Sequence, residues 1–190
     1  MSEATQGPGR LELVGEFVNT RDFDEDVDRL ATPRELADWL TGHGLARTGL
    51  EARPADLRRA VELREALRAA LLANNDGEPV DDGALAVLNR TARRGRLVVR
   101  FGRDGEAALE PVSNDVDGAL AHLLAIVHDA AETGAWARLK VCRSDTCRWA
   151  FYDQSKNRSR HWCSMDVCGS QAKARSYRRR RAAGPKARQT

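Results

Sequence analysis

The chain has 190 residues, 31% of them charged, and a formal net charge of only +3. This length suits one domain of ordinary size together with a small second one. No apolar run approaches the roughly 18 residues that a membrane-spanning helix needs, and the N-terminus is polar rather than signal-like. These features argue against membrane and secreted proteins, so we expect a soluble, cytoplasmic protein.

Charge is unevenly distributed along the chain. Residues 138–190 contain 15 Lys and Arg against 3 acids, a net charge of +12, whereas residues 1–137 contain 16 against 25, a net charge of −9. No acid follows Asp166, and residues 178–181 are consecutive arginines. A basic segment of this kind suits a polyanionic partner, with a solvated tail as the alternative.

Asn19 and Thr20 directly follow the apolar pair Phe17-Val18. Polar residues in this position either cap a helix or face a pocket, and capping is the more common role. We keep Asn19 and Thr20 as possible ligand-pocket residues.

Helix boundary signals dominate residues 32–77. Thr32-Pro33-Arg34-Glu35 is a capping box with proline at the first helical position, and Gly42 and Gly44 end the predicted helix. Pro54 begins a longer amphipathic helix, which ends in the Asn-Asn-Asp-Gly sequence of residues 74–77.

Two further helices flank a predicted β-hairpin. The first is capped by the aspartates at 81–82, and the second begins near residues 113–114. Between them, residues 97–101 and 107–111 read as strands joined by a turn, and a lone hairpin must pack on helices to be stable. The residues expected to be buried in the two helices are Leu85, Leu88, Ala92, Val116, Leu120, Leu123, Leu124 and Val127.

The helical region carries no recognised catalytic motif. It lacks a phosphate-binding G-x-x-x-x-G-K-[ST] loop, a metalloprotease H-E-x-x-H and a G-x-S-x-G nucleophile elbow. His122 and His128 are six residues apart, which places them on different faces of a helix and not together as metal ligands. We therefore expect no enzymatic activity.

Four cysteines follow the spacing C-x4-C-x15-C-x4-C, and the chain has no other cysteine. Two short-range pairs separated by about fifteen residues are typical of a tetrahedral Zn²⁺ site. Two reduced thiol pairs, or two disulfides in a secreted protein, are the alternatives, but secreted scaffolds have a higher cysteine density. We predict one structural Zn²⁺ whose ligands are Cys142, Cys147, Cys163 and Cys168.

The residues around the cysteines predict a hairpin followed by a helix. Leu139 and Val141 are spaced as on one face of a strand that ends at Cys142, and Trp149 and Phe151 share one face of a second strand. A segment rich in Ala, Lys and Arg follows Cys168 and is predicted to be a helix. The core that residues 138–181 can form is too small to be stable unaided, so we expect this segment to need the metal to fold. The predicted fold is α+β, a mainly helical N-terminal domain with a small β-hairpin plus a C-terminal treble-clef-like zinc finger with four cysteine ligands. The predicted segments are 1–10 (flexible), 11–137 (helical), 138–181 (finger) and 182–190 (flexible basic tail).

Six short motifs point to a known family, four of them around the cysteines and two near the start of the chain. They are Cys142-x4-Cys147, Trp149-x-Phe151-x-Asp153-x-Ser155-x-Asn157, Arg160-x-Trp162-Cys163-Ser164-Met165, Cys168-Gly169-x-x-Ala172-Lys173, Phe17-x-Asn19-Thr20 and Thr32-Pro33-x-x-Leu36-x-x-Trp39-Leu40. Over roughly residues 138–180 the chain resembles the bacterial CGNR-type zinc finger, and its opening is similar to the ABATE domain that precedes this finger.

The resemblance implies a stress-induced transcription regulator whose finger binds DNA through basic residues. One position departs from the family, because Ser170-Gln171 replaces the Asn-Arg of the name-giving Cys-Gly-Asn-Arg motif. The finger's zinc ligands are unaffected by this change. Phosphate attraction through many basic residues makes affinity fall steeply with salt. The candidate nucleic-acid contacts are Arg158, Arg160, Lys173, Arg175, Arg178, Arg179 and Arg180.

Other functions are compatible with the same residues. The finger could serve as a protein-interaction module or as a zinc-thiolate redox sensor, and RNA could be the polyanion. A homodimer, a small-molecule effector and the transcription machinery are further possible partners. The Ala- and Arg-rich composition is typical of a GC-rich bacterial genome.

Overall fold

The computed structural model describes residues 9–182. Residues 1–8 and 183–190, which hold most of the two segments predicted to be flexible, lie outside them. The described part forms six α-helices and three two-stranded antiparallel sheets, which confirms the predicted α+β class. In chain order the elements are α1 (Leu11–Val18), β1 (Arg21–Asp22), β2 (Val27–Asp28), α2 (Pro33–Gly42), α3 (Pro54–Asp76), α4 (Asp82–Gly95), β3 (Leu97–Phe101), β4 (Ala107–Pro111), α5 (Val116–Glu132), the 3₁₀ turn η1 (Trp136–Arg138), β5 (Leu139–Val141), β6 (Ala150–Tyr152), the π-helical turn η2 (Met165–Gly169) and α6 (Ser170–Ala182).

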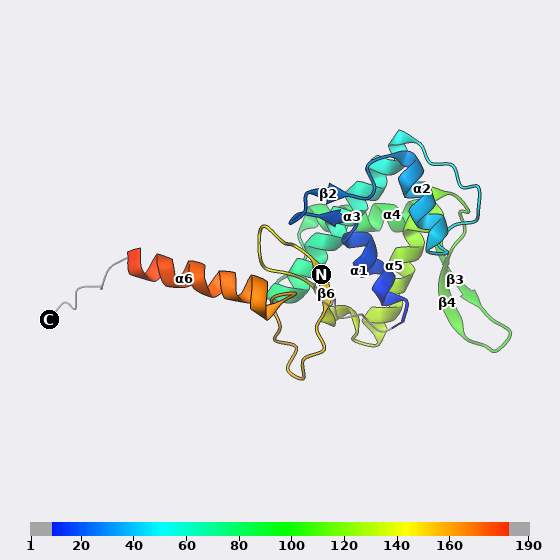
Figure 1. Cartoon of the computed structure of the whole chain (residues 1–190). Helices are drawn as coiled ribbons and strands as arrows, with labels where there is room; N and C mark the ends of the chain where they lie inside the picture. Colours follow the sequence, from blue (N-terminus) through cyan, green and yellow to red (C-terminus); the bar gives the residue numbers. More distant parts are fainter. Residues whose placement is uncertain (1–8, 183–190) are drawn as a thin grey trace.

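Helix α3 is the central element of the body, in contact with α1, α2, α4 and α5 (Figure 1). It begins at Pro54, and the Asp56 carboxylate accepts a hydrogen bond from the Arg53 N–H (2.7 Å). It ends at Asp76, and Gly77 takes a left-handed conformation with φ of +71°, which glycine adopts without strain. Both ends confirm the sequence prediction. The core leucines of α3 are Leu63, Leu67 and Leu71.

Helix α2 begins at the predicted capping box. The Thr32 hydroxyl accepts a hydrogen bond from the Glu35 N–H (3.2 Å), and the Glu35 carboxylate accepts one from the Thr32 N–H (2.8 Å). Pro33 occupies the first helical position, where its missing N–H costs nothing.

Helices α4 and α5 pack closely, and here one sequence prediction was wrong. Leu85, expected in the buried stripe of α4, is 40% exposed. Leu88 packs partly buried against the core as predicted, but the fully buried residues of α4 are the small residues Ala84, Thr91 and Gly95. A Cβ atom at Gly95 would lie 2.1 Å from the Ala121 Cβ of α5, so small side chains are what allow this close approach.

Replacing Gly95 with alanine should therefore destabilise the fold by about 1–3 kcal/mol, because the added methyl overpacks the contact between α4 and α5. Gly42→Ala is the matched control, since nothing lies within 4 Å of a Cβ built there. Urea titration of both variants measures the effect. Equal midpoints for the two variants would contradict the close-packing explanation.

The β3–β4 hairpin has the strand limits predicted from sequence, with Val99 opposite Leu109. One face is entirely apolar, because alternate residues on both strands carry hydrocarbon side chains. The hairpin packs on α5, but only in part, because Val99 is 59% exposed and Phe101 is 74% exposed.

The last elements place a small sheet against the helical body and a helix away from it. Strand β5 packs on α3 and β6 packs on α1. Leu139, Val141 and Ala150 of this sheet belong to the main hydrophobic core. Helix α6 instead extends away from the body (Figure 1). Among residues 9–182, no helix is both long and apolar enough to cross a membrane.

Candidate metal centre and basic helix

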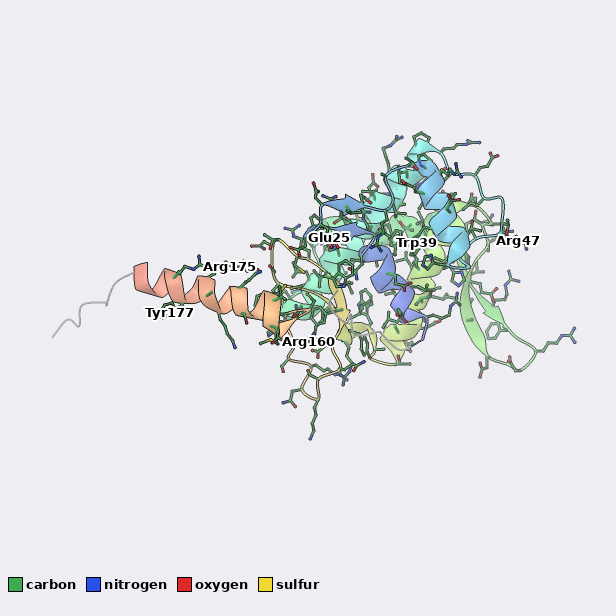
Figure 2. All side chains as sticks on the ribbon, viewed as in Figure 1. Glu25, Trp39, Arg47, Arg160, Arg175 and Tyr177 are labelled. Carbon is green, nitrogen blue, oxygen red and sulfur yellow. The ribbon has the colours of Figure 1, made fainter. Side chains whose placement is uncertain are left out.

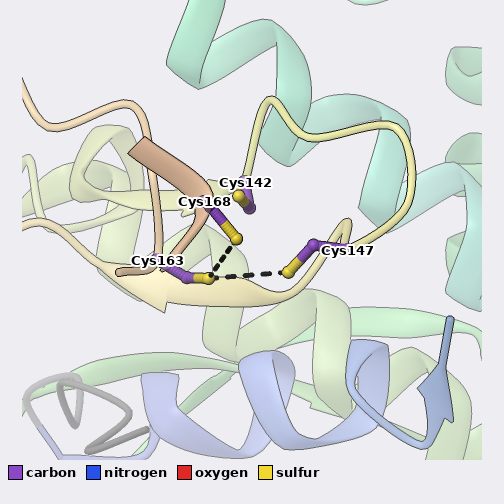
Figure 3. Close-up of side chains that lie close together, drawn as sticks. All are labelled: Cys142, Cys147, Cys163 and Cys168. Atoms are coloured by element: carbon purple, nitrogen blue, oxygen red, sulfur yellow. Dashed lines mark hydrogen bonds between the residues drawn. The ribbon is translucent and has the colours of Figure 1, made fainter. Parts of the chain in front are cut away.

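The four cysteine thiols converge at the junction of the β5–β6 hairpin and the η2 turn (Figure 3). Cys142 directly follows β5, Cys147 lies in the loop before β6, Cys163 precedes η2, and Cys168 lies within it. Backbone hydrogen bonds hold these turns, among them Cys142 N–H to the Trp149 carbonyl (2.9 Å). The sequence pattern thus folds into one cluster built from two turns.

The sulfur positions fit tetrahedral zinc. All four Sγ atoms lie within 4.8 Å of one another, with 3.5 Å between Cys147 and Cys163 and 3.8 Å between Cys163 and Cys168. A Zn–S bond of about 2.3 Å places tetrahedral sulfurs about 3.8 Å apart. A disulfide needs about 2.05 Å, and all four cysteines are free. The geometry therefore favours a metal over the alternative of two disulfides.

The proximity of the four thiols perturbs their acidity. Hydrogen bonds from Cys147 and Cys163 lower the pKa of Cys142 to about 2. The hydrogen bond to Cys142 raises the pKa of Cys147 to about 12 and also raises the pKa of Cys163. Burial raises the pKa of the Cys168 thiol. The neighbouring thiols therefore oppose one another's ionisation, whereas a central dication allows all four to ionise.

Local residues close the site on both sides. Buried Phe151 and half-buried Trp162 pack against the cysteines in a small cluster separate from the main core. At Gly169 an added Cβ would lie 3.1 Å from the Met165 side chain, so glycine suits the tight turn after Cys168. His161 lies outside the thiol cluster and contacts Asn75 instead, with 2.6 Å between the ring Nδ1 and the side-chain oxygen.

Comparison with family models identifies the two parts of the chain. The model of ABATE, described as "Putative stress-induced transcription regulator", matches residues 11–135. The chain belongs to the ABATE family. The CGNR zinc finger model matches residues 138–181, and a comparison with curated proteins gave no match. The resemblance seen in the sequence is confirmed. Together with the cysteine geometry, it shows that the chain holds one structural Zn²⁺.

A buried ion pair organises the CGNR finger next to the metal. Lys140 and Asp153 are 3% and 0% exposed, and their Nζ and Oδ2 atoms are 2.8 Å apart. The ammonium also donates to the carbonyls of Arg158 (2.6 Å) and Arg160 (3.3 Å). The carboxylate also accepts from the backbone N–H groups of Ser155 and Arg160. Burial alone would raise the pKa of Asp153, but these hydrogen bonds outweigh it and lower the pKa to about 2.

The end of α3 holds the finger against the ABATE domain. The Asn74 amide donates to the carbonyls of Trp136 and Leu139. The Asn75 amide donates to the carbonyls of Val141 (2.7 Å) and His161 (3.0 Å). In the next position, Asp76 pairs with Arg143. From the sequence we interpreted this polar run only as a helix stop.

Asn19 makes a second link between the domains. It is the C-cap residue of α1, where its backbone N–H donates to the Gly15 carbonyl (2.9 Å), so the backbone takes the expected capping role and the side chain does not. The side-chain amide instead donates to the Ala150 carbonyl (3.0 Å), and its oxygen accepts from the Ala150 N–H (2.7 Å). The Thr20 hydroxyl donates to the Phe17 carbonyl (2.7 Å). Both residues also line a pocket at the domain seam.

The predicted nucleic-acid residues fall into three structural groups. Lys173 and Arg178 are exposed on α6 and Arg175 is half-buried there; Arg175 is labelled in Figure 2. Arg158 is exposed on the finger loop. Arg160 lies inside the finger, with its guanidinium donating to the carbonyls of Trp162 and Cys163 and lying 5.3 Å from the Phe151 ring centroid. The remaining two, Arg179 and Arg180, lie on α6 with side chains outside the described ones.

Proposed function

We propose that the chain is a zinc-dependent transcription regulator that contacts DNA through α6. The observation that carries the proposal is a basic helix that begins at the metal centre and extends away from the body (Figure 1). Its width suits the major groove of B-DNA, which admits an α-helix. The family description of ABATE as a transcription regulator supports the same function.

In this proposal the metal has a structural role. Four cysteine ligands complete a tetrahedron and leave no open coordination position, so we propose no catalytic function. The zinc holds η2 in place, and η2 is continuous with α6. The exposed basic residues Lys173, Arg178 and Arg158, with Arg175 beside them, supply phosphate contacts. We leave Arg160 out of the interface because its guanidinium is already engaged within the finger.

Changing Lys173, Arg175 and Arg178 to alanine tests this proposal. We expect duplex affinity to fall at least about tenfold at about 150 mM salt, and the slope of log K against log salt to decrease by about 3, because each lost phosphate contact removes about one unit. Fluorescence anisotropy with a labelled duplex measures both quantities. Zinc content must remain at one ion per chain in the variant.

The matched control changes three exposed arginines of the ABATE domain, Arg47, Arg94 and Arg103. Arg47 lies on the side of the molecule opposite α6 (Figure 2). This control removes the same charge but should retain nearly full affinity. Unchanged affinity in the α6 variant, or an equal loss in both variants, would contradict the assignment. Sequencing of retained genomic fragments then separates a specific regulator, which enriches a motif, from a nonspecific binder.

A further inference from the structure

A pocket of about 460 Å³ lies at the seam between the ABATE domain and the CGNR finger. Helices α1 and α2 supply one side, and the finger supplies Leu139 and residues 149–152. Its volume falls within the roughly 300–1,000 Å³ typical of small-molecule sites. Because both domains line it, a bound ligand would contact both at once.

Aromatic side chains form a large part of the lining. Trp39 of α2 stacks on His43 with 4.1 Å between ring centroids and packs against Phe17 at 5.3 Å, so its ring is held in place. Trp149 and Tyr152 line the pocket from the finger. Among residues 9–182, neither the Trp149 indole N–H nor the Tyr152 hydroxyl has a hydrogen-bond partner within the protein. The walls therefore combine flat apolar surface with unused polar groups.

Acidic residues outnumber basic ones in the lining of the pocket. Glu12 and Glu16 stand one turn apart on α1, whereas Arg29 is the only lysine or arginine among the described lining residues. Within the described chain, Glu12 has no ion-pair partner, and Glu16 has only His43, with Nε2 and Oε2 3.6 Å apart. With His43 neutral, the lining carries a net charge of −1. A cation is thus favoured over an anion.

We propose that this pocket binds a small organic cation with an aromatic group, of the arylalkylamine class. The ammonium group pairs with Glu12 and Glu16, and the ring packs against Trp39, Trp149 and Tyr152. Ring faces attract cations and offset aromatic rings alike. The site is separate from α6, so the proposal stands or fails independently of nucleic-acid binding.

The test uses two probes of similar shape and opposite charge, 2-phenylethylammonium and 3-phenylpropionate. Isothermal titration of each into zinc-loaded, full-length protein without nucleic acid gives the two affinities. We expect the amine to bind at least about tenfold more tightly, which corresponds to about 1.4 kcal/mol.

The variant Glu12→Gln with Glu16→Gln sharpens the test, because it changes the net charge of the lining from −1 to +1 while keeping its shape. The amine should lose about tenfold in affinity, and the preference should shift towards the carboxylate, which Arg29 can pair. The matched control is Glu51→Gln with Glu78→Gln, two exposed acids outside the pocket.

The control variant should keep the preference of the unchanged protein. Circular dichroism and zinc content verify that both variants are folded, which is expected because none of the four glutamates belongs to the hydrophobic core. Equal affinity for the two probes, no amine binding at about 10 mM amine, a concentration well above a millimolar Kd, or an equal loss in the control variant would each overturn the proposal.

Discussion

Removing zinc is expected to destabilise the ABATE domain together with the finger. Leu139, Val141 and Ala150 belong to the main core, and Cys142 is the residue after Val141. Structural zinc contributes about 10–16 kcal/mol in small fingers, whereas a whole domain is stable by only about 5–15 kcal/mol. Loss of the metal should therefore release β5 and β6 from the core and expose apolar surface on α1 and α3.

Chelator titration followed by hydrogen exchange measures this effect. Amide protection should fall along α1 and α3 as well as in the finger, and the thermal unfolding midpoint of the whole chain should drop. Cys163→Ser should have the same effect in the presence of zinc. Restoring zinc to the unchanged protein must restore protection. Loss of protection confined to residues after 138 would show that the two domains are energetically separate.

Replacing Asp153 with alanine should lower the free energy of unfolding by about 3–5 kcal/mol, because it leaves the buried Lys140 ammonium without its counter-charge. The loop from Asp153 to Arg160 would also lose the carboxylate that accepts its backbone N–H groups. Denaturant unfolding of the zinc-loaded protein measures the change. The control is Asp145→Ala in the same finger, an exposed acid, for which at most about 0.5 kcal/mol is expected. An equally small loss of unfolding free energy in Asp153→Ala would show that the ion pair does not stabilise the fold.

The same carboxylate predicts a pH dependence. Its pKa is about 2 in the folded chain, below the unfolded value of about 3.9. The stabilisation of the fold by the ionised Asp153 carboxylate is therefore fully present above about pH 4 and is lost as the pH falls from there through about 2. The Asp153→Ala variant should lose this part of the acid dependence, whereas the Asp145→Ala control should retain it.

Local signals were sufficient to predict most of the elements. Capping residues and prolines placed the ends of α2 and α3, and alternation with a turn placed β3 and β4, because these features act over a few residues. The cysteine spacing was enough for the metal site. One residue of the predicted buried face of α4, Leu85, was mispredicted, because helix periodicity favoured leucine, whereas the close approach at Gly95 selects small side chains.

The contacts between the domains could not be predicted from the sequence. Asn19 and Asn75 bind backbone groups more than 60 residues away, and no local pattern distinguishes such an asparagine from one that ends a helix. Nor does a local pattern indicate that Asp153 pairs with Lys140, which is an unusual charged residue in a buried strand. Their pairing depends on the register of β5 and β6, which only the folded hairpin defines.

The continuity of η2 and α6 bears on how the basic helix forms. Starting a helix in water is unfavourable, because the first turn fixes several residues for a single hydrogen bond. Here the turn that contains Cys168 is already held by the metal centre. Helix α6 can therefore extend from a turn that is already formed, despite the repulsion among its many basic residues. Positions next to that turn, such as Gln171 and Lys173, are the most firmly placed. In the proposed complex we expect them to set the register on DNA, while arginines farther along α6 add affinity.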